Sequence, residues 1–121
     1  MYTGVDIVEI ARWQMMLVRY PSRVEKLFTE EEIRHCERRG KKKAESYAGL
    51  WAAREAASKA LQTGFSGASF QDAYITWGPH GEPILHLQGK FLERAKAQGI
   101  TEWSLSISHE STMAIAFVVM E

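Results

Sequence analysis

The chain has 121 residues, a length that suits one domain able to bury roughly two-thirds of the surface that its unfolded form exposes. Its 15 basic and 15 acidic side chains cancel, so the molecule as a whole has no excess positive charge with which to bind nucleic acid. The single cysteine, Cys36, excludes an intrachain disulfide, and no basic segment followed by a long apolar run opens the sequence, so we expect a cytoplasmic protein without a membrane span.

A strand and an amphipathic helix are predicted at the start of the chain. Residues 1–8 are apolar and rich in β-favouring side chains, which predicts a strand. Residues 9–20 are predicted to be helical, because four apolar side chains recur there at helical spacing: Ile10, Trp13, Met16 and Leu17. Pro21 interrupts this pattern.

Two further helices are predicted in the middle of the chain. Thr29 and Glu32 have the spacing of a capping box, which marks a helix start, and we expect Gly40 to end that helix. After the lysines at 41–43, an alanine-rich segment predicts a long helix to about Gln62, whose small side chains allow close packing on one side. We expect this helix to be the central scaffold.

A hairpin and a short helix are predicted next. The strand-like runs 70–77 and 83–87 flank a turn-rich insert, which indicates a β-hairpin. Residues 90–98 predict a short helix that ends at Gly99.

Two strands are predicted near the end of the chain. From Trp103 onward apolar residues alternate with serines, as on a half-buried strand, and residues 113–120 form the returning strand. Three apolar residues of the returning strand could line either the core or a subunit contact, and we favour the core for each: Ile115, Phe117 and Val119.

No internal repeat, low-complexity tract or interdomain linker separates these elements. The mixture of strands and helices without strict alternation favours an α+β fold over a doubly wound sheet. Residues 1–121 are therefore expected to form one domain.

Four side chains are candidates for chemistry. Glu55 and Lys59 lie one helical turn apart, although such a pair is more commonly a simple helix stabiliser. Asp6 at the end of a strand and His109 before a turn are, taken alone, more often structural than catalytic. Three separated segments that carry Asp, Glu with Lys, and His nevertheless suggest phosphate chemistry.

Four segments form a joint pattern across nearly the whole chain: residues 4–12 (GVDIVEIAR), 28–32 (FTEEE), 51–61 (WAAREAASKAL) and 106–109 (SISH). In their order and separations, and at this chain length, they resemble the holo-acyl-carrier-protein synthase family of phosphopantetheinyl transferases. The resemblance implies an α+β fold in which an antiparallel sheet packs against the long helix. It also implies a homotrimer with coenzyme A sites between adjacent subunits.

The resemblance implies a specific reaction and a role for each candidate. The family transfers the 4′-phosphopantetheine arm of coenzyme A to a serine of apo acyl carrier protein in fatty-acid biosynthesis, releases 3′,5′-ADP and uses Mg²⁺. Asp6 and Glu55 match its metal ligands, and Mg²⁺ needs only one or two carboxylates besides substrate phosphates. Lys59 matches the lysine that stabilises or protonates the departing phosphate, and His109 matches a coenzyme A contact. The proton acceptor stays open between metal-ordered water, Glu55 acting indirectly and another group.

Further nucleotide contacts follow from the resemblance. Thr63 and Gly64 are expected to bring backbone amides to a phosphate, although a glycine after a helix is commonly only a cap. Lys42 resembles a contact to the 3′-phosphate, although lysines 41–43 also fit a solvated face. Three positions carry leucine, arginine and glutamine where relatives have arginine, lysine and glycine, which leaves the nucleotide contacts open: Leu50, Arg54 and Gln62.

The first helix is the candidate surface for the carrier protein. Arg12, Met16 and Arg19 are spaced so that they present a basic, partly apolar surface, which an ordinary exposed helix would also show. In the resembling family this helix recognises an acidic helix of acyl carrier protein, for which arginines provide complementary charge.

Three other functions compete with this interpretation. One is a phosphopantetheinyl transferase for polyketide or other specialised carrier domains. Another is a noncatalytic module that binds coenzyme A or a carrier, for which Asp6, Glu55 and Lys59 would be unexpected. Nucleic-acid binding through Arg38, Arg39 and the following lysines is disfavoured by the neutral charge and by the absence of stacking-aromatic motifs.

Overall fold

Helices and strands follow one another without strict alternation, which confirms the predicted α+β class. The computed structural model describes residues 1–121 and contains, in chain order, β1 (Tyr2–Glu9), α1 (Ile10–Arg19), α2 (Arg23–Leu27), α3 (Glu30–Glu37), η1 (Gly40–Lys42), α4 (Lys43–Ala60), η2 (Phe70–Asp72), β2 (Ala73–Trp77), β3 (Pro83–Leu87), α5 (Gly89–Ala97), β4 (Trp103–His109) and β5 (Met113–Met120). No helix has both the length and the apolar character needed to cross a lipid bilayer.

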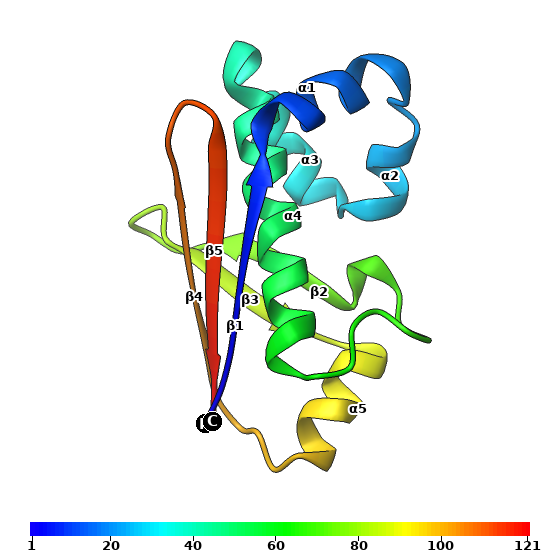
Figure 1. The fold of residues 1–121 in the computed structure, drawn as a ribbon, viewed down its shortest axis with the longest axis vertical. Helices are drawn as coiled ribbons and strands as arrows, with labels where there is room; N and C mark the ends of the chain where they lie inside the picture. The colour runs from blue at the N-terminus through cyan, green and yellow to red at the C-terminus, as the bar shows by residue number, and fades with distance from the viewer.

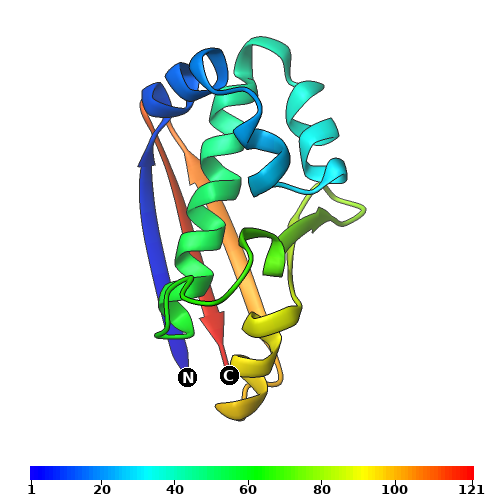
Figure 2. The same cartoon turned by 90° about the vertical axis from the view of Figure 1, so that its right-hand side faces the viewer.

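Helix α4 is the scaffold of the fold, as the sequence predicts. Figure 1 shows the strands β1, β5 and β4 along one side of α4, with α1, α2 and α3 gathered at one end of the molecule and α5 at the other. Figure 2 shows the two termini side by side, at the end opposite α1. Their closeness follows from the pairing of Tyr2 with Met120 in the sheet.

The strands form two antiparallel sheets. The first has the order β1-β5-β4, and the second is the predicted hairpin of β2 and β3. In the first sheet Asp6 pairs with Ala116, which pairs in turn with Ile107. The indole nitrogen of Trp103 on β4 donates to the carbonyl of Leu85 on β3 over 2.8 Å, which joins the two sheets.

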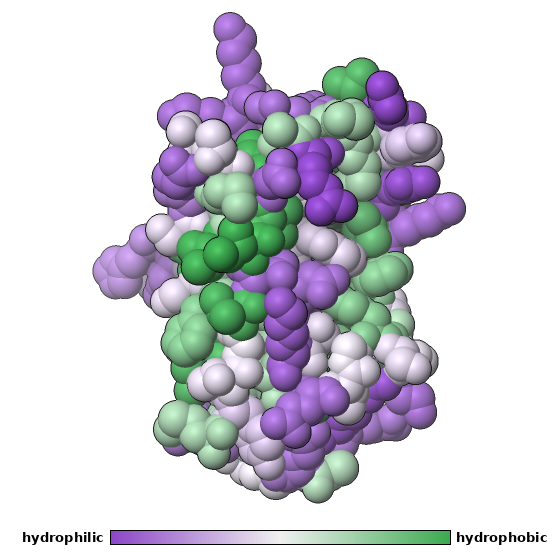
Figure 3. Space-filling model, in the orientation of Figure 1, coloured by the Kyte–Doolittle hydropathy of each residue, from purple (hydrophilic) through white to green (hydrophobic).

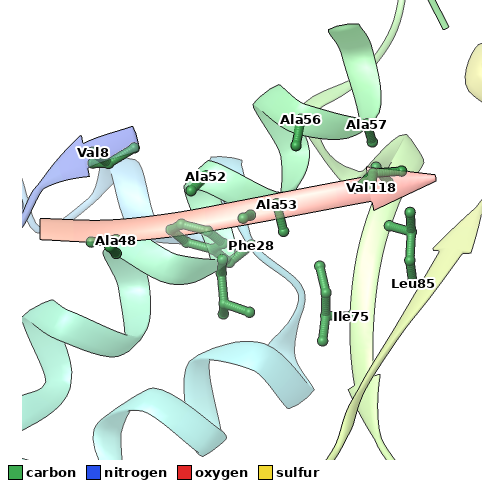
Figure 4. Packing of buried hydrophobic residues seen from close by; sticks show 14 of the residues in the cluster. Val8, Phe28, Ala48, Ala52, Ala53, Ala56, Ala57, Ile75, Leu85 and Val118 are labelled. Carbon is green, nitrogen blue, oxygen red and sulfur yellow. The ribbon is translucent and has the colours of Figure 1, made fainter. Parts of the chain in front are cut away.

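Small residues let α4 lie unusually close to the first sheet. A Cβ atom on Gly4 would lie only 1.9 Å from the carbonyl oxygen of Ala56, so only glycine fits where β1 crosses the helix. Figure 4 shows where β5 crosses α4, with Val118 and four alanines of the helix at the crossing, all fully buried: Ala52, Ala53, Ala56 and Ala57. The result is a thin, alanine-rich interface that brings polar side chains of β1 within reach of α4.

A buried ion pair fixes the short helices to this scaffold. Arg54 of α4 and Glu32 of α3 are both fully buried, and the guanidinium binds the carboxylate through two hydrogen bonds of 2.6 and 2.9 Å. Glu32 also accepts from the amides of Thr29 and Ile75, so it closes the predicted capping box and reaches β2. The Nε–H group of Arg54 donates to the carbonyl oxygen of Phe70 over 2.8 Å. The positive charge of Arg54 is therefore neutralised by Glu32 within the core.

Two sequence predictions about the helical and hairpin segments need correction, and one helix was missed. The helix predicted to end at Gly40 ends at Glu37, and Gly40 instead begins the short helix η1 in a left-handed conformation. Helix α2 was not predicted, because it has only five residues directly after the break at Pro21. The strand predicted from residue 70 begins at Ala73, since the Ser69 and Asp72 side chains cap a 3-10 turn before it.

The core assignment on β5 also needs correction. The expected core residues Ile115 and Phe117 are 37% and 45% exposed, and Val119 is only partly buried. The residues that alternate with them face α4 and are fully buried: Ala114, Ala116, Val118 and Met120. Helix α4 packs on the face that these residues share, so Ile115, Phe117 and Val119 point to the other face of the sheet.

Candidate functional site

Asp6 and Lys59 meet where β1 crosses the last turns of α4. The ammonium nitrogen of Lys59 lies 3.0 Å from Asp6 Oδ1 and donates a second bond of 3.0 Å to the carbonyl oxygen of Val5. Lys59 therefore pairs with Asp6, 53 residues away, rather than with Glu55 on its own helix. A lysine that served only to stabilise the helix would pair with Glu55 instead.

Glu55 belongs to the same group of charges. Burial raises the pKa of the Glu55 carboxyl, the nearby negative charge of Asp6 raises it further, and the positive charge of Lys59 lowers it. An acidic group whose ionisation is disfavoured both by burial and by a neighbouring carboxylate is typical of functional sites. The structure thus brings together three of the four predicted catalytic residues.

A cavity of about 590 Å³ opens beside this group. Asp6 and Glu55 line it together with Arg12 and Met16 of α1, the helix predicted to bind the carrier protein. Arg19, the third predicted carrier contact, is exposed in the last turn of α1 and lies outside this cavity. The carboxylates and part of the candidate docking helix therefore share one opening.

The carboxylate pair suits Mg²⁺ bound together with a substrate. The structure has no group of three or more His, Cys, Asp or Glu side chains that could hold a metal ion by themselves. Mg²⁺ commonly takes one or two carboxylates, with waters and substrate phosphates completing its six ligands. Asp6 and Glu55, with their mutual repulsion and their open cavity, fit such a site and do not fit a closed structural metal site.

His109, the fourth predicted catalytic residue, lies elsewhere. Its Nε2 is 3.2 Å from Glu45 Oε1, and the same oxygen accepts a 2.9 Å bond from Arg39. These three residues line a smaller cavity of about 270 Å³. Sequence reasoning missed Glu45, because nothing in the local pattern around it points to a histidine 64 positions away.

One chain does not place His109 beside Asp6. Strand β5 lies between β1 and β4, and two steps across a sheet span about 10 Å. Helix α4 covers the face that both side chains share, with Glu45 near one end and Glu55 nearer the other. The predicted catalytic residues therefore form two separate groups on two sides of α4, one with Asp6 and Glu55 and the other with His109.

The predicted nucleotide contacts lie at opposite ends of α4. Lys42 immediately precedes the helix and is exposed, at the same end as Glu45. Thr63 and Gly64 follow the other end, so the 18 helical residues separate the two places by about 27 Å.

The structure accounts for the three departures from the family pattern. Arg54 is enclosed with Glu32, so it cannot act as a nucleotide contact within this fold. Leu50 is 3% exposed and belongs to the core at the wall of the His109 cavity. Gln62 is the only non-glycine residue with a positive φ, 64°, which explains why a glycine suits this position.

The sequence and the fold of the chain have close counterparts in one family. The model of the 4′-phosphopantetheinyl transferase superfamily matches residues 2–118, and the chain belongs to that family. Among its relatives are the holo-[acyl-carrier-protein] synthases of Kocuria rhizophila, 41% identical over 98% of this chain and 90% of the relative, and of Alkalilimnicola ehrlichii, 42% identical over 98% and 94%. The crystal structure of Helicobacter pylori holo-[acyl-carrier-protein] synthase in complex with coenzyme A superposes with a TM-score of 0.84 at 37% identity and covers 98% of this chain and 99% of that one.

Proposed function

We propose that the chain is a holo-[acyl-carrier-protein] synthase, which transfers 4′-phosphopantetheine from coenzyme A to a serine of apo acyl carrier protein and releases 3′,5′-ADP. The relatives that share its length and fold carry this name. The observation that carries the proposal is the pair of carboxylates, Asp6 and Glu55, in one cavity that also reaches α1, with Lys59 bound to Asp6 beside it.

Asp6 and Glu55 would hold Mg²⁺ in this reaction. When bound there, the cation supplies charge neutralisation at the diphosphate of coenzyme A. By holding the cation, the two carboxylates would position the diphosphate in the cavity that they share with α1, from which the carrier serine would arrive. Burial and the charge of Asp6 disfavour the ionised form of Glu55, and a divalent cation bound beside both carboxylates would offset this cost.

Lys59 would stabilise the charge that develops on the departing phosphate. Its ammonium is held by Asp6 and by the carbonyl of Val5, while about half of its side chain stays exposed. Because a lysine held in place needs no reorganisation when charge develops, this arrangement supports electrostatic stabilisation of the leaving group.

Helix α1 would bind the carrier protein. Arg12 and Met16 line the cavity that holds the carboxylates, so a carrier docked on α1 would present its serine to Asp6 and Glu55. Charge reversal in Arg12→Glu or Arg19→Glu should raise the KM for the carrier at least about tenfold and leave the KM for coenzyme A nearly unchanged, because rim charges steer encounter with an acidic partner. Steady-state kinetics with each substrate varied would measure this, and an equal loss for both substrates would contradict it.

The proposed assembly is a homotrimer with its sites between subunits. The face of the first sheet that points away from α4 carries exposed apolar side chains, and Figure 3 shows apolar residues gathered over this sheet. They come from β1 and β5: Val5, Ile7, Ile115 and Phe117. Contact between copies through this face would cover the patch. It would also let His109 of one subunit approach the carboxylates of another.

The function is tested by incubating the protein with coenzyme A, Mg²⁺ and apo carrier protein and weighing the carrier by mass spectrometry. We expect the carrier to gain one phosphopantetheine group, and a chelator to prevent the gain. A carrier of unchanged mass, with several folded apo carriers from fatty-acid synthesis, would contradict the proposed function.

A further inference from the structure

A single arginine of α5 holds the segment that follows α4. The guanidinium of Arg94 donates to the hydroxyl of Thr63 and to the carbonyl oxygen of Gly64, both over 3.0 Å, and also to the carbonyl oxygen of Ser66. Three acceptors in four consecutive residues thus bind one side chain from another helix. The rigid fork of a guanidinium is suited to such a contact, because its donors have a fixed geometry.

The donors of the same segment are left free. None of the backbone N–H groups of residues 63–67 donates a hydrogen bond within the chain, whereas the flanking amides of Gln62 and Ala68 donate to Lys59 and Phe65. Arg94 therefore occupies the acceptors of a segment whose amides have no partner. Consecutive free amides in a turn that contains left-handed residues form a binding place for an anion.

Phe65 anchors the segment from the other side. Its ring stacks on Trp51 of α4 with centroids 5.9 Å apart and contacts Phe91 of α5 at 5.3 Å. Arg94 lies near the same Phe91 ring, 5.7 Å from its centroid. The segment is thus fixed by an apolar contact at Phe65 and by the guanidinium at its polar atoms.

The charge of Arg94 also offsets an unfavourable field. The carboxyl end of a helix carries about half a negative charge, which repels an anion bound just beyond it. The segment follows the carboxyl end of α4, where Leu61 is the C-terminal cap. The full positive charge of Arg94 outweighs this partial negative charge. The electrostatic field at the free amides therefore favours a bound phosphate.

We infer that Arg94 is a positioning residue of the transferase, which holds residues 63–67 so that their free amides bind a phosphate of coenzyme A. This inference rests on the proposed function. The sequence indicated only Thr63 and Gly64 as phosphate contacts. The inference extends this binding segment to residues 63–67 and adds Arg94 of α5 as the residue that holds it. Arg94 acts through the segment, and its own donors are already occupied by Thr63, Gly64 and Ser66.

The test compares Arg94→Ala with the wild type and with Lys96→Ala, which removes an exposed charge that lies outside every ion pair on the same helix. We expect R94A to raise the KM for coenzyme A about tenfold, the equivalent of one charge-assisted contact, with less than a twofold change in the KM for the carrier. The dissociation constant for 3′,5′-ADP, measured by calorimetry without carrier, should rise by a similar factor. Millimolar guanidinium should restore much of the loss in R94A and leave K96A unaffected.

Two outcomes with R94A would overturn the inference alone. One is an active R94A enzyme with a wild-type KM for coenzyme A, and the other is an equal loss for both substrates without guanidinium rescue, which would mark a purely structural role. If R94A does not fold, Arg94→Lys replaces the fork by one ammonium nitrogen and should raise the KM for coenzyme A about threefold. An unchanged value in folded R94K would also overturn the inference. A wild-type protein that binds neither coenzyme A nor 3′,5′-ADP would instead overturn the proposed function and the inference together.

Discussion

The choice of partner by Lys59 is the most informative contact of a single residue. An isolated helix would favour a pair with Glu55 one turn away, yet Lys59 binds Asp6 of β1 over 3.0 Å. This leaves Glu55 half-buried beside a second carboxylate and without a direct ion pair. The site therefore keeps an acidic group in an environment that does not stabilise its charge, which favours the arrival of a cation.

Glu55 should lower the stability of the protein at neutral pH when no divalent cation is bound. Burial and Asp6 raise the pKa of its carboxyl above the ordinary value of 4.5, so the folded state holds its proton more tightly than the unfolded state. Stability then falls as the pH rises from 4.5 through the raised pKa. In a chelator, Glu55→Gln should melt roughly 2–4 °C above the wild type at pH 7.

The difference in melting temperature between E55Q and the wild type should depend on pH, and this dependence tests the cause assigned to it. Below the ordinary pKa of 4.5 the wild-type carboxyl is neutral in both states, so the two proteins should melt together. Thermal unfolding followed by circular dichroism from pH 4 to 8 measures it. Glu31→Gln, which changes an exposed carboxylate on α3, is the control. A melting temperature of E55Q at or below that of the wild type at pH 7 would contradict this account of Glu55.

At the scale of the elements, the ion pair between Arg54 and Glu32 joins α3, α4 and β2. Arg54→Ala would leave a buried carboxylate without its counter-charge, and we expect a loss of about 3–5 kcal/mol in the free energy of unfolding. Arg34→Ala removes an exposed pair with Glu30 and should cost less than about 1 kcal/mol. Urea unfolding measures both values, and equal losses would contradict the assigned role of the buried pair.

Several elements could be predicted from the sequence because a local signal defines them. The capping box at Thr29 and Glu32 marks the start of α3, and alternation with serine defines β4. Helix α2 could not be predicted, since its five residues are too few to show a period. The sequence of β5 defines two faces but does not indicate which of them α4 covers. The prediction that Ile115 and Phe117 lie in the core, based on the usual burial of large apolar residues, was therefore wrong.

The same limit applies to the candidate site. The sequence grouped Asp6, Glu55 and Lys59 correctly through the resemblance, since their order along the chain matches the family pattern. The register of the sheet, which separates His109 from them, is set by pairing across β5 and has no local signal in the sequence. The contact of His109 with Glu45 and the hydrogen bonds of Arg94 to the segment after α4 also depend on the tertiary arrangement.

At the scale of the whole molecule, the exposed apolar face of the first sheet predicts how copies of the chain assemble. Phe117→Glu places a charge in the middle of this patch, and the proposed trimer should dissociate to folded monomers. Light scattering after gel filtration measures the mass, and circular dichroism checks the fold. Transfer should fall at least about hundredfold, because the two groups of site residues would no longer meet.

A matched control separates assembly from general surface effects. Ile84 on β3 is 41% exposed, close to the 45% of Phe117, but lies in the other sheet. Ile84→Glu should keep the wild-type mass and activity. A fully active F117E monomer, or an I84E protein that dissociates equally, would contradict the proposed assembly.

The central claim is that Asp6 and Glu55 together form the transfer site, and the most direct measurement is the rate at which the apo carrier gains phosphopantetheine. Asp6→Asn and Glu55→Gln preserve the size of the side chains and remove the charges that would bind the cation. By mass spectrometry with coenzyme A and Mg²⁺, we expect each variant to transfer at least about a hundredfold more slowly than the wild type while it remains folded. Transfer by either variant at the wild-type rate would contradict the claim.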